Sequence, residues 1–211
     1  MTVVDIIDYG AGNLASVTKA ITAVGATPRV VTTPTDLDKS QAVLVPGVGH
    51  FAATRALHDD WHRAVRARLD AGAALLGICL GMQWLFEGSD EAPDVAGLGL
   101  FSGRCFRLQP GSTNTDEPAV KIPHVGWNAL DRTSAPSRLL AHVPTGAYAY
   151  FTHTFAAPLG PETVASTTHS DTFASVVERD RVFGAQWHPE KSSDTGLQVL
   201  KTFITIAEGG R

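Results

Sequence analysis

The sequence contains little cysteine, because only Cys79 and Cys105 occur among its 211 residues. Two cysteines cannot form a disulfide framework, and their spacing is neither that of a zinc site nor that of a CxxC redox motif. The first basic residue is Lys19, so the N-terminus lacks the charged region of a secretory signal. We therefore expect a reducing, cytoplasmic setting.

A surplus of positive charge and long apolar runs are also lacking. Lysine and arginine total 17 against 21 aspartates and glutamates, so a nucleic-acid partner is not expected. The longest apolar stretch, residues 71–86, is interrupted by glycines and is shorter than the roughly 20 residues of a membrane span. With 44% hydrophobic residues the composition is globular, and the length predicts a single domain over residues 1–211.

The first half of the sequence alternates short β-branched runs with helical patterns. Asn13 is expected to cap the first helix and Gly25 to end it. Strands alternating with helices predict an α/β fold, with an open, mostly parallel sheet that carries helices on both faces. The expected strands are residues 3–9, 30–32, 42–45 and 74–78, and the expected helices are residues 14–24 and 61–69.

The second half of the sequence changes character and is rich in strand-like runs separated by turn residues. A polar stretch at residues 110–118 predicts an exposed loop. A final helix has apolar residues at helical spacing from Leu197 to Ala207, with Ser193 or Asp194 as its cap. The expected strands are residues 101–108, 147–155, 163–168, 173–178 and 182–186.

Residues 77–81 read GICLG, the G-x-C-x-G pattern of a nucleophile elbow with cysteine in place of serine. The tight strand-to-helix turn requires small residues two positions to either side of Cys79. The helix N-terminus behind Cys79 favours its thiolate, and the N–H of Leu80 is placed to donate to an oxyanion. A buried structural thiol is the alternative for Cys79 and the preferred interpretation for Cys105.

A histidine and a carboxylate lie two residues apart in His188–Pro189–Glu190. The proline favours an extended conformation at His188, in which residues i and i+2 point to the same side. A carboxylate on one imidazole nitrogen directs the other nitrogen towards a nucleophile, which is the arrangement of a catalytic triad. A solvent-exposed pair in a loop is the alternative.

The segment VPGVG at residues 45–49 directly follows an expected strand. Gly47 and Gly49 permit unusual backbone angles and the close approach of a ligand. The N–H of Val48 is therefore a candidate second oxyanion donor, and an ordinary turn is the alternative.

Three of these segments, GICLGMQ (77–83), VPGVG (45–49) and QWHPEKS (186–192), together resemble the class I, triad-type glutamine amidotransferases. Within that family, DYGAGN (8–13), KIPHVGWN (121–128) and YFTHTF (150–155) are similar to the glutaminase subunits of imidazole glycerol phosphate synthase, which act in histidine biosynthesis. The resemblance covers nearly the whole chain. It implies a flavodoxin-like amidotransferase architecture with an added antiparallel region.

The resemblance implies that Cys79 attacks the side-chain amide of glutamine, while His188, held by Glu190, protonates the departing ammonia. The N–H groups of Val48 and Leu80 would stabilise the oxyanion. No cofactor and no metal are implied. The residues implied to contact glutamine are Gly47, Gly49, Gln83, Glu91, Thr154 and Phe155.

The resemblance also implies a heterodimer with a (β/α)8-barrel cyclase subunit. That subunit would receive the ammonia and make imidazole glycerol phosphate and aminoimidazole carboxamide ribotide. Trp127 and Lys191 are implied at the interface, whereas Trp127 without the resemblance would be interpreted as a core residue. Neither a nucleic acid nor a membrane is an expected partner.

Competing interpretations come from two other patterns and from the elbow itself. Residues 10–15 fit G-x-G-x-x-A of a dinucleotide site, but Asp36, the candidate acidic residue, comes late and beyond a proline. His58 and His62 are four residues apart on an expected helix and could bind a metal, although a solvated helix face is preferred. A cysteine hydrolase that acts without a partner, and a non-catalytic docking subunit, are further alternatives.

Overall fold

The computed structural model describes residues 1–111 and 120–209. Its strands are β1 (Val3–Ile7), β2 (Thr27–Val31), β3 (Ala42–Val45), β4 (Ala74–Ile78), β5 (Gly88–Ser89), β6 (Ala92–Ala96), β7 (Arg104–Arg107), β8 (His124–Arg132), β9 (Ala147–His153), β10 (Phe155–Ala156), β11 (Thr163–Thr168), β12 (Thr172–Arg179) and β13 (Val182–Ala185). Its helices are α1 (Leu14–Ala23), α2 (Asp59–Asp70), α3 (Leu80–Trp84) and α4 (Ser193–Glu208), with 3-10 turns η1 (Pro34–Leu37), η2 (Phe51–Ala56) and η3 (Pro189–Lys191).

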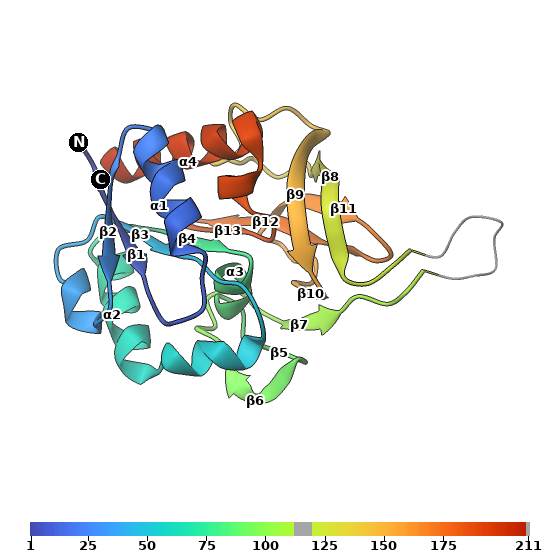
Figure 1. Ribbon diagram of the computed structural model, residues 1–211, viewed down its shortest axis with the longest axis horizontal. Helices are drawn as coiled ribbons and strands as arrows, with labels where there is room; N and C mark the ends of the chain where they lie inside the picture. Colours follow the sequence, from blue (N-terminus) through green and yellow to red (C-terminus); the bar gives the residue numbers. More distant parts are fainter. Residues whose placement is uncertain (112–119, 210–211) are drawn as a thin grey trace.

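The main sheet of the described chain has nine strands in the order β2-β1-β3-β4-β13-β12-β11-β8-β9 (Figure 1). Its first five strands are parallel, as the alternation of strands and helices predicts. The carboxyl ends of β3, β4 and β13 therefore meet at one edge of the sheet. Open α/β sheets place their ligands at this edge.

Side chains alternate between two cores, one on each face of the parallel strands. Ile6 and Leu76 pack in the core that contains the apolar faces of α1 and α4. Ile7 and Leu75 pack in the core that contains α2. Figure 1 shows α1 and α4 together on one side of the sheet and α2 on the other. Because neighbouring residues of a strand point to opposite faces, the near-continuous apolar strands require this double cover.

The remaining strands of the main sheet, β12, β11, β8 and β9, pair antiparallel. The α/β fold class with an added antiparallel region is confirmed. Strand β8 was not expected from the sequence, because it contains Gly126 and Asn128 and has little β-branched character. Its pairing with β9 and β11 decides its conformation. The short strands β10, β7, β5 and β6, of which only β7 lies within an expected run, form a separate four-stranded sheet.

The predicted ends of the first helix are confirmed. The side chain of Asn13 accepts the N–H of Ser16 at 3.3 Å, and Gly25 adopts a φ of 85° directly after the helix. The loop predicted at residues 110–118 falls mostly on residues outside the described part of the chain. Within the described part, no helix is both long enough and apolar enough to cross a membrane.

The predicted cap of the final helix is wrong. Ser193 is the first residue of α4 and Asp194 lies in its first turn, while Ser192 occupies the position before the helix. The 3-10 turn η3 runs almost directly into α4, so the chain has no free extended residue at 193 or 194. The hydroxyl of Ser192 donates to the carbonyl oxygen of His188 at 2.7 Å.

Candidate active site

Cys79 occupies the elbow between β4 and α3. Its φ of 51° lies in the left-handed region, which costs a non-glycine residue about 1–3 kcal/mol. A Cβ atom on Gly77 would lie 2.6 Å from the carbonyl oxygen of Gly81, and one on Gly81 would overlap the carbonyl oxygen of Val45. The glycines are therefore required by close backbone packing on both sides of the nucleophile, and the predicted elbow is present.

His188 reaches the same edge of the sheet through the neighbouring strand. Strand β13 pairs with β4 so that Ala185 lies beside Ile78, and each strand then continues into its polar segment. The Nδ1 atom of His188 lies 2.8 Å from Oε1 of Glu190, and their side chains are 1% and 2% exposed. A buried imidazole paired with a carboxylate is the orienting half of a triad.

The segment from His188 to Glu190 is not extended throughout, as the sequence predicts, but turns at Pro189. Only His188 is extended, with φ −102° and ψ 96°, because Pro189–Lys191 forms the 3-10 turn η3. Proline has the backbone angle of a first helical residue, so it favours this turn. The side chains of His188 and Glu190 still meet, because the turn brings the carboxylate back over the imidazole.

The other nitrogen of His188, Nε2, is buried and has no hydrogen-bond partner among the described residues. Burial lowers the pKa of His188, but the negative charge of the nearby Cys79, together with Glu190, more than compensates and raises the pKa to about 10. Cys105 differs, because it is fully buried and its burial raises the pKa of its thiol. The electrostatics thus link His188 to Cys79 and leave Cys105 a structural thiol.

Neither expected oxyanion donor is free in this conformation. The N–H of Val48 donates to the carbonyl oxygen of Ala11 at 3.4 Å, and the N–H of Leu80 donates to the carbonyl oxygen of Gly47 at 3.3 Å. Gly49 has a φ of 99°, which only glycine adopts readily. The loop would have to turn before both N–H groups could face a reacting carbonyl.

A cavity of about 330 Å³ opens in front of Cys79. Gly47 is not among its lining residues, because it is packed beneath the loop against the hydroxyl of Tyr9. Glu91 accepts the N–H of Phe51 at 2.6 Å. The cavity is lined by five of the expected substrate residues, Gly49, Gln83, Glu91, Thr154 and Phe155, by the elbow residues Cys79 and Leu80, and by Pro123, Thr152 and His153.

Gln186 was not singled out from the sequence, yet it contacts the nucleophile. Its Nε2 atom lies 3.7 Å from Sγ of Cys79. It is fully buried and precedes His188 by two residues, so its place in the QWHPEKS segment was the available sequence signal. The carbonyl oxygen of Thr152, 4.0 Å from Sγ, is a second neighbour that carried no sequence signal.

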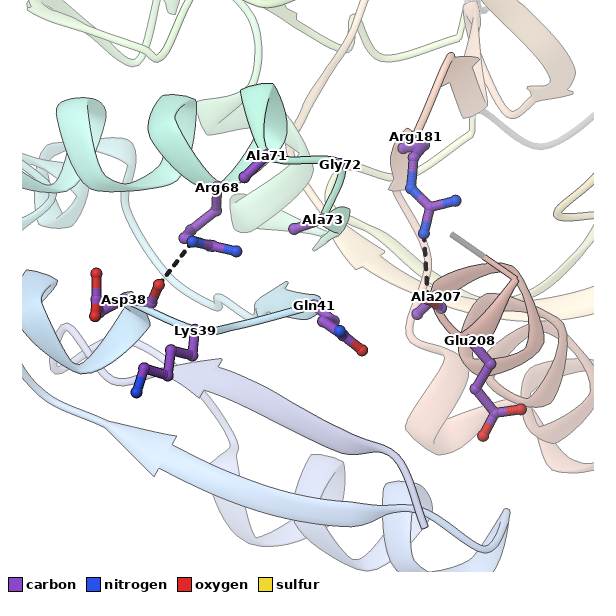
Figure 2. Close-up of a pocket in the computed structure, with 10 residues that line it drawn as sticks. All are labelled: Asp38, Lys39, Gln41, Arg68, Ala71, Gly72, Ala73, Arg181, Ala207 and Glu208. Atoms are coloured by element: carbon purple, nitrogen blue, oxygen red, sulfur yellow. Dashed lines mark hydrogen bonds between the residues drawn. The ribbon is translucent and has the colours of Figure 1, made fainter. Parts of the chain in front are cut away.

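A larger cavity, of about 550 Å³, lies at the opposite end of the sheet (Figure 2). Its residues include those that precede β3, β4 and β13. Its arginines hold backbone carbonyls: Arg68 donates to Asp38 at 2.7 Å and Arg181 to Ala207 at 3.3 Å. It is lined by Asp38, Lys39, Gln41, Arg68, Ala71, Gly72, Ala73, Arg181, Ala207 and Glu208, and none of these is a cysteine or histidine. The smaller cavity at the carboxyl edge is therefore the candidate active site.

Trp127 of β8 and Lys191 of η3, the two residues expected at a partner interface, both lie against Tyr150 of β9. Trp127 on β8 is 51% exposed, which excludes a core role, and Tyr148 on β9, which pairs with Ala129 of β8, is 61% exposed. The ring of Trp127 packs edge-on against Tyr150 with centroids 6.1 Å apart. The Nζ atom of Lys191 lies 5.9 Å from the same Tyr150 ring.

The residues behind the competing interpretations have structural contacts. A Cβ atom on Gly12, in the glycine loop considered for a dinucleotide, would lie 3.3 Å from the Pro46 side chain, so this loop packs on the VPGVG segment. The His58 side chain caps α2 by accepting the N–H of Asp60. His62 packs edge-on against a tryptophan of α3.

Comparison with known proteins gives consistent results. The sequence profile described as "Glutamine amidotransferase class-I" matches residues 5–207. The chain is 40% identical over 209 residues to the "Imidazole glycerol phosphate synthase subunit HisH" of Microcystis aeruginosa, covering 97% of this chain and 95% of that protein. It is 42% identical over 206 residues to the protein of the same name from Xylella fastidiosa strain Temecula1, covering 98% of each. The "Structure of PurLQS from Thermotoga maritima" has the same fold, with a TM-score of 0.72, 17% identity and coverage of 97% of this chain and 98% of that one.

Proposed function

Because this chain belongs to the class-I glutamine amidotransferase family, together with the HisH subunits of imidazole glycerol phosphate synthase, we propose that it hydrolyses glutamine for histidine biosynthesis. The proposed catalytic residues are Cys79, His188 and Glu190. The observation that carries the proposal is the buried His188–Glu190 pair at 2.8 Å beside a cysteine on a nucleophile elbow. A single amidotransferase domain over residues 1–211 is part of the proposal.

The proposed reaction begins when the Cys79 thiolate attacks the carboxamide carbon of glutamine. Protonated His188 gives its Nε2 proton to the amide nitrogen, the C–N bond breaks and ammonia leaves, which produces a glutamyl thioester. Water then adds to the thioester while Nε2 of His188 takes its proton. Cleavage of the C–S bond releases glutamate and restores the thiolate.

Glu190 has an orienting role in this mechanism. Its carboxylate accepts only, so it fixes a proton on Nδ1 of His188 and leaves Nε2 to exchange protons at the reacting atoms. The raised pKa of His188, about 10, keeps the imidazole protonated and ready to donate to the leaving nitrogen at neutral pH.

The proposed oxyanion donors, the N–H groups of Val48 and Leu80, require a change in the loop. Their present bonds to Ala11 and to Gly47 are long, at 3.4 and 3.3 Å, so breaking them costs little compared with the charge-assisted bonds gained. We infer that this conformation is a resting state of low activity. Gln83, Glu91, Thr154 and Phe155 would bind glutamine in the cavity.

The proposed partner is the (β/α)8-barrel cyclase subunit, which would use the ammonia to make imidazole glycerol phosphate and aminoimidazole carboxamide ribotide. The names of the relatives describe them as subunits, which implies a partner subunit. The exposed aromatic face of β8 and β9 supports docking here, since tryptophan and tyrosine often dominate interface energetics. Trp127 and Lys191 are the proposed contacts, and a cytoplasmic location stays a prediction from the sequence.

The test is glutamate release from glutamine by the purified chain, alone and with a barrel cyclase subunit carrying its nucleotide ligand. Cys79→Ser should abolish release, and Cys105→Ser should retain it because Cys105 lies outside the cavity. Stimulation by the ligated partner is expected. Equal glutamate release with and without the partner would mean that the chain is a hydrolase that acts without a partner. No glutamate release under any condition would refute the proposed glutaminase activity.

A further inference from the structure

Two buried histidines outside the triad are joined across strands β8 and β9, which lie side by side in Figure 1. The Nδ1 atom of His124 lies 3.0 Å from Nε2 of His153. On one side, Nε2 of His124 lies 3.3 Å from Nδ2 of Asn128. On the other side, Nδ1 of His153 lies 3.0 Å from the carbonyl oxygen of Phe155. The proposed mechanism uses neither histidine.

The carbonyl at one end fixes the position of every hydrogen in this series. Because the Phe155 oxygen only accepts, Nδ1 of His153 must carry the hydrogen, and its Nε2 then accepts from Nδ1–H of His124. The Nε2 atom of His124 in turn accepts from the amide of Asn128. The assignment gives each ring one hydrogen, as neutral imidazoles require. Both rings are neutral because burial, with a smaller effect of neighbouring histidines, lowers the pKa of His124 to about 4 and that of His153 to about 3.

The same Phe155 carbonyl also organises the amides beside the nucleophile. It accepts a second bond from Nε2 of Gln83 at 2.7 Å. The other hydrogen of that amide points to Oε1 of Gln186 at 3.2 Å. With its oxygen engaged, Gln186 can present only its N–H to Cys79, 3.7 Å away. A free Gln186 could instead turn its oxygen towards the sulfur, which would repel a thiolate.

We propose that this histidine–amide relay, defined as Asn128, His124, His153, the Phe155 carbonyl, Gln83 and Gln186, holds the Gln186 N–H on the nucleophile. In this arrangement Gln186 stabilises the thiolate of Cys79, because hydrogen bonding to the charged form favours that form. His124 and His153 are positioning residues that act through the carbonyl and the two amides. The relay rests on the proposed function only for its effect on glutamine hydrolysis. The contact between Gln186 and the sulfur of Cys79 is independent of substrate.

The first experiment compares two variants of His124 in the full chain. His124→Leu removes the donor to His153, whereas in His124→Asn the amide nitrogen takes the place of Nδ1–H. His169→Leu is the matched control, because its ring stacks on His124 at 4.1 Å without joining the relay. The readouts are the rate constant for alkylation of Cys79 by iodoacetamide at pH 7, and kcat and KM for glutamate release with the partner.

We expect His124→Leu to lower the alkylation rate and kcat by about tenfold, equivalent to about 1.4 kcal/mol, with KM nearly unchanged. His124→Asn should recover to within about threefold of the wild type, and His169→Leu should resemble the wild type. The relay is overturned if His124→Asn is as impaired as His124→Leu. Equal effects of His169→Leu and His124→Leu would also overturn it.

A second arm keeps the test decisive if His124→Leu fails to fold. Gln186→Glu keeps the shape of the side chain but turns a carboxylate oxygen towards the sulfur, so alkylation of Cys79 should slow by more than about tenfold. An unchanged alkylation rate in Gln186→Glu would refute the contact. If the wild type releases no glutamate, the proposed function fails, while the alkylation rates still decide the relay.

Discussion

Replacing Glu190 by glutamine removes one negative charge from a buried pair and changes little else. The carboxylate lies 2.8 Å from Nδ1 of His188, and both side chains are almost fully buried, so solvent does not screen the contact. Glutamine has nearly the same shape, and its amide oxygen can still accept the Nδ1–H bond. The substitution therefore tests the charge of Glu190 separately from its position.

The magnitude follows from the difference between a charged and a neutral hydrogen bond. A hydrogen bond to a charged group contributes about 1.5–3 kcal/mol and a neutral one about 1 kcal/mol, so the variant loses roughly 0.5–2 kcal/mol of stabilisation of the imidazolium. At about 1.4 kcal/mol per tenfold change, kcat should fall by roughly 2- to 30-fold. KM should change little, because Glu190 does not line the cavity in front of Cys79.

The assay is steady-state glutamate release by the complex, with Glu91→Gln and Asp194→Asn as comparisons. Glu91 lines the cavity, so its variant should raise KM instead of lowering kcat. Asp194 is exposed in the first turn of α4, so its amide variant should resemble the wild type. A Glu190→Gln enzyme with unchanged kcat would refute the orienting role of the carboxylate.

Four further predictions concern the elbow and its imidazole. Iodoacetamide should modify Cys79 faster than Cys105 near pH 7, because burial raises the pKa of Cys105. Equal rates by peptide mass spectrometry would refute an activated thiolate at Cys79. Cys79→Ala should lower the pKa of His188 from about 10, because a negative charge next to the cation is lost; NMR titration of the imidazole measures this. The pKa of folded His188 lies above the usual 6.5, so the protonated imidazole stabilises the fold fully below pH 6.5 and this stabilisation is lost as the pH rises towards 10. The free energy of unfolding, measured in urea, should therefore fall less over this pH range in Cys79→Ala than in the wild type. Gly81→Ala should lower the free energy of unfolding by about 1–3 kcal/mol in urea, because the new Cβ overlaps the carbonyl of Val45, and an unchanged midpoint would contradict this packing.

The sequence determined the features that depend on residues close together in the chain. The elbow at Cys79 follows from glycines two positions away, because only they permit the tight turn. The contact between His188 and Glu190 spans two residues, so it was predicted even though the segment forms a 3-10 turn and not an extended strand. The parallel half of the sheet followed from the alternation of apolar strands and amphipathic helices.

Only the tertiary structure decided the features that join distant segments. Strand β8 carries no strong strand signal and forms because β9 and β11 pair with it. The N–H of Val48 is turned towards Ala11, in a loop that packing places beside it, so sequence spacing could not reveal this hydrogen bond.

The contacts of Gln186 and of the histidine pair depend on tertiary structure for the same reason. His124 and His153 meet through strand register across 29 residues, and Gln186 reaches Cys79 across 107. Hydrogen bonds of this kind are fixed by sheet pairing and by the burial of the groups that form them. A single sequence specifies the residues that make these bonds, but the folded chain decides which of them meet.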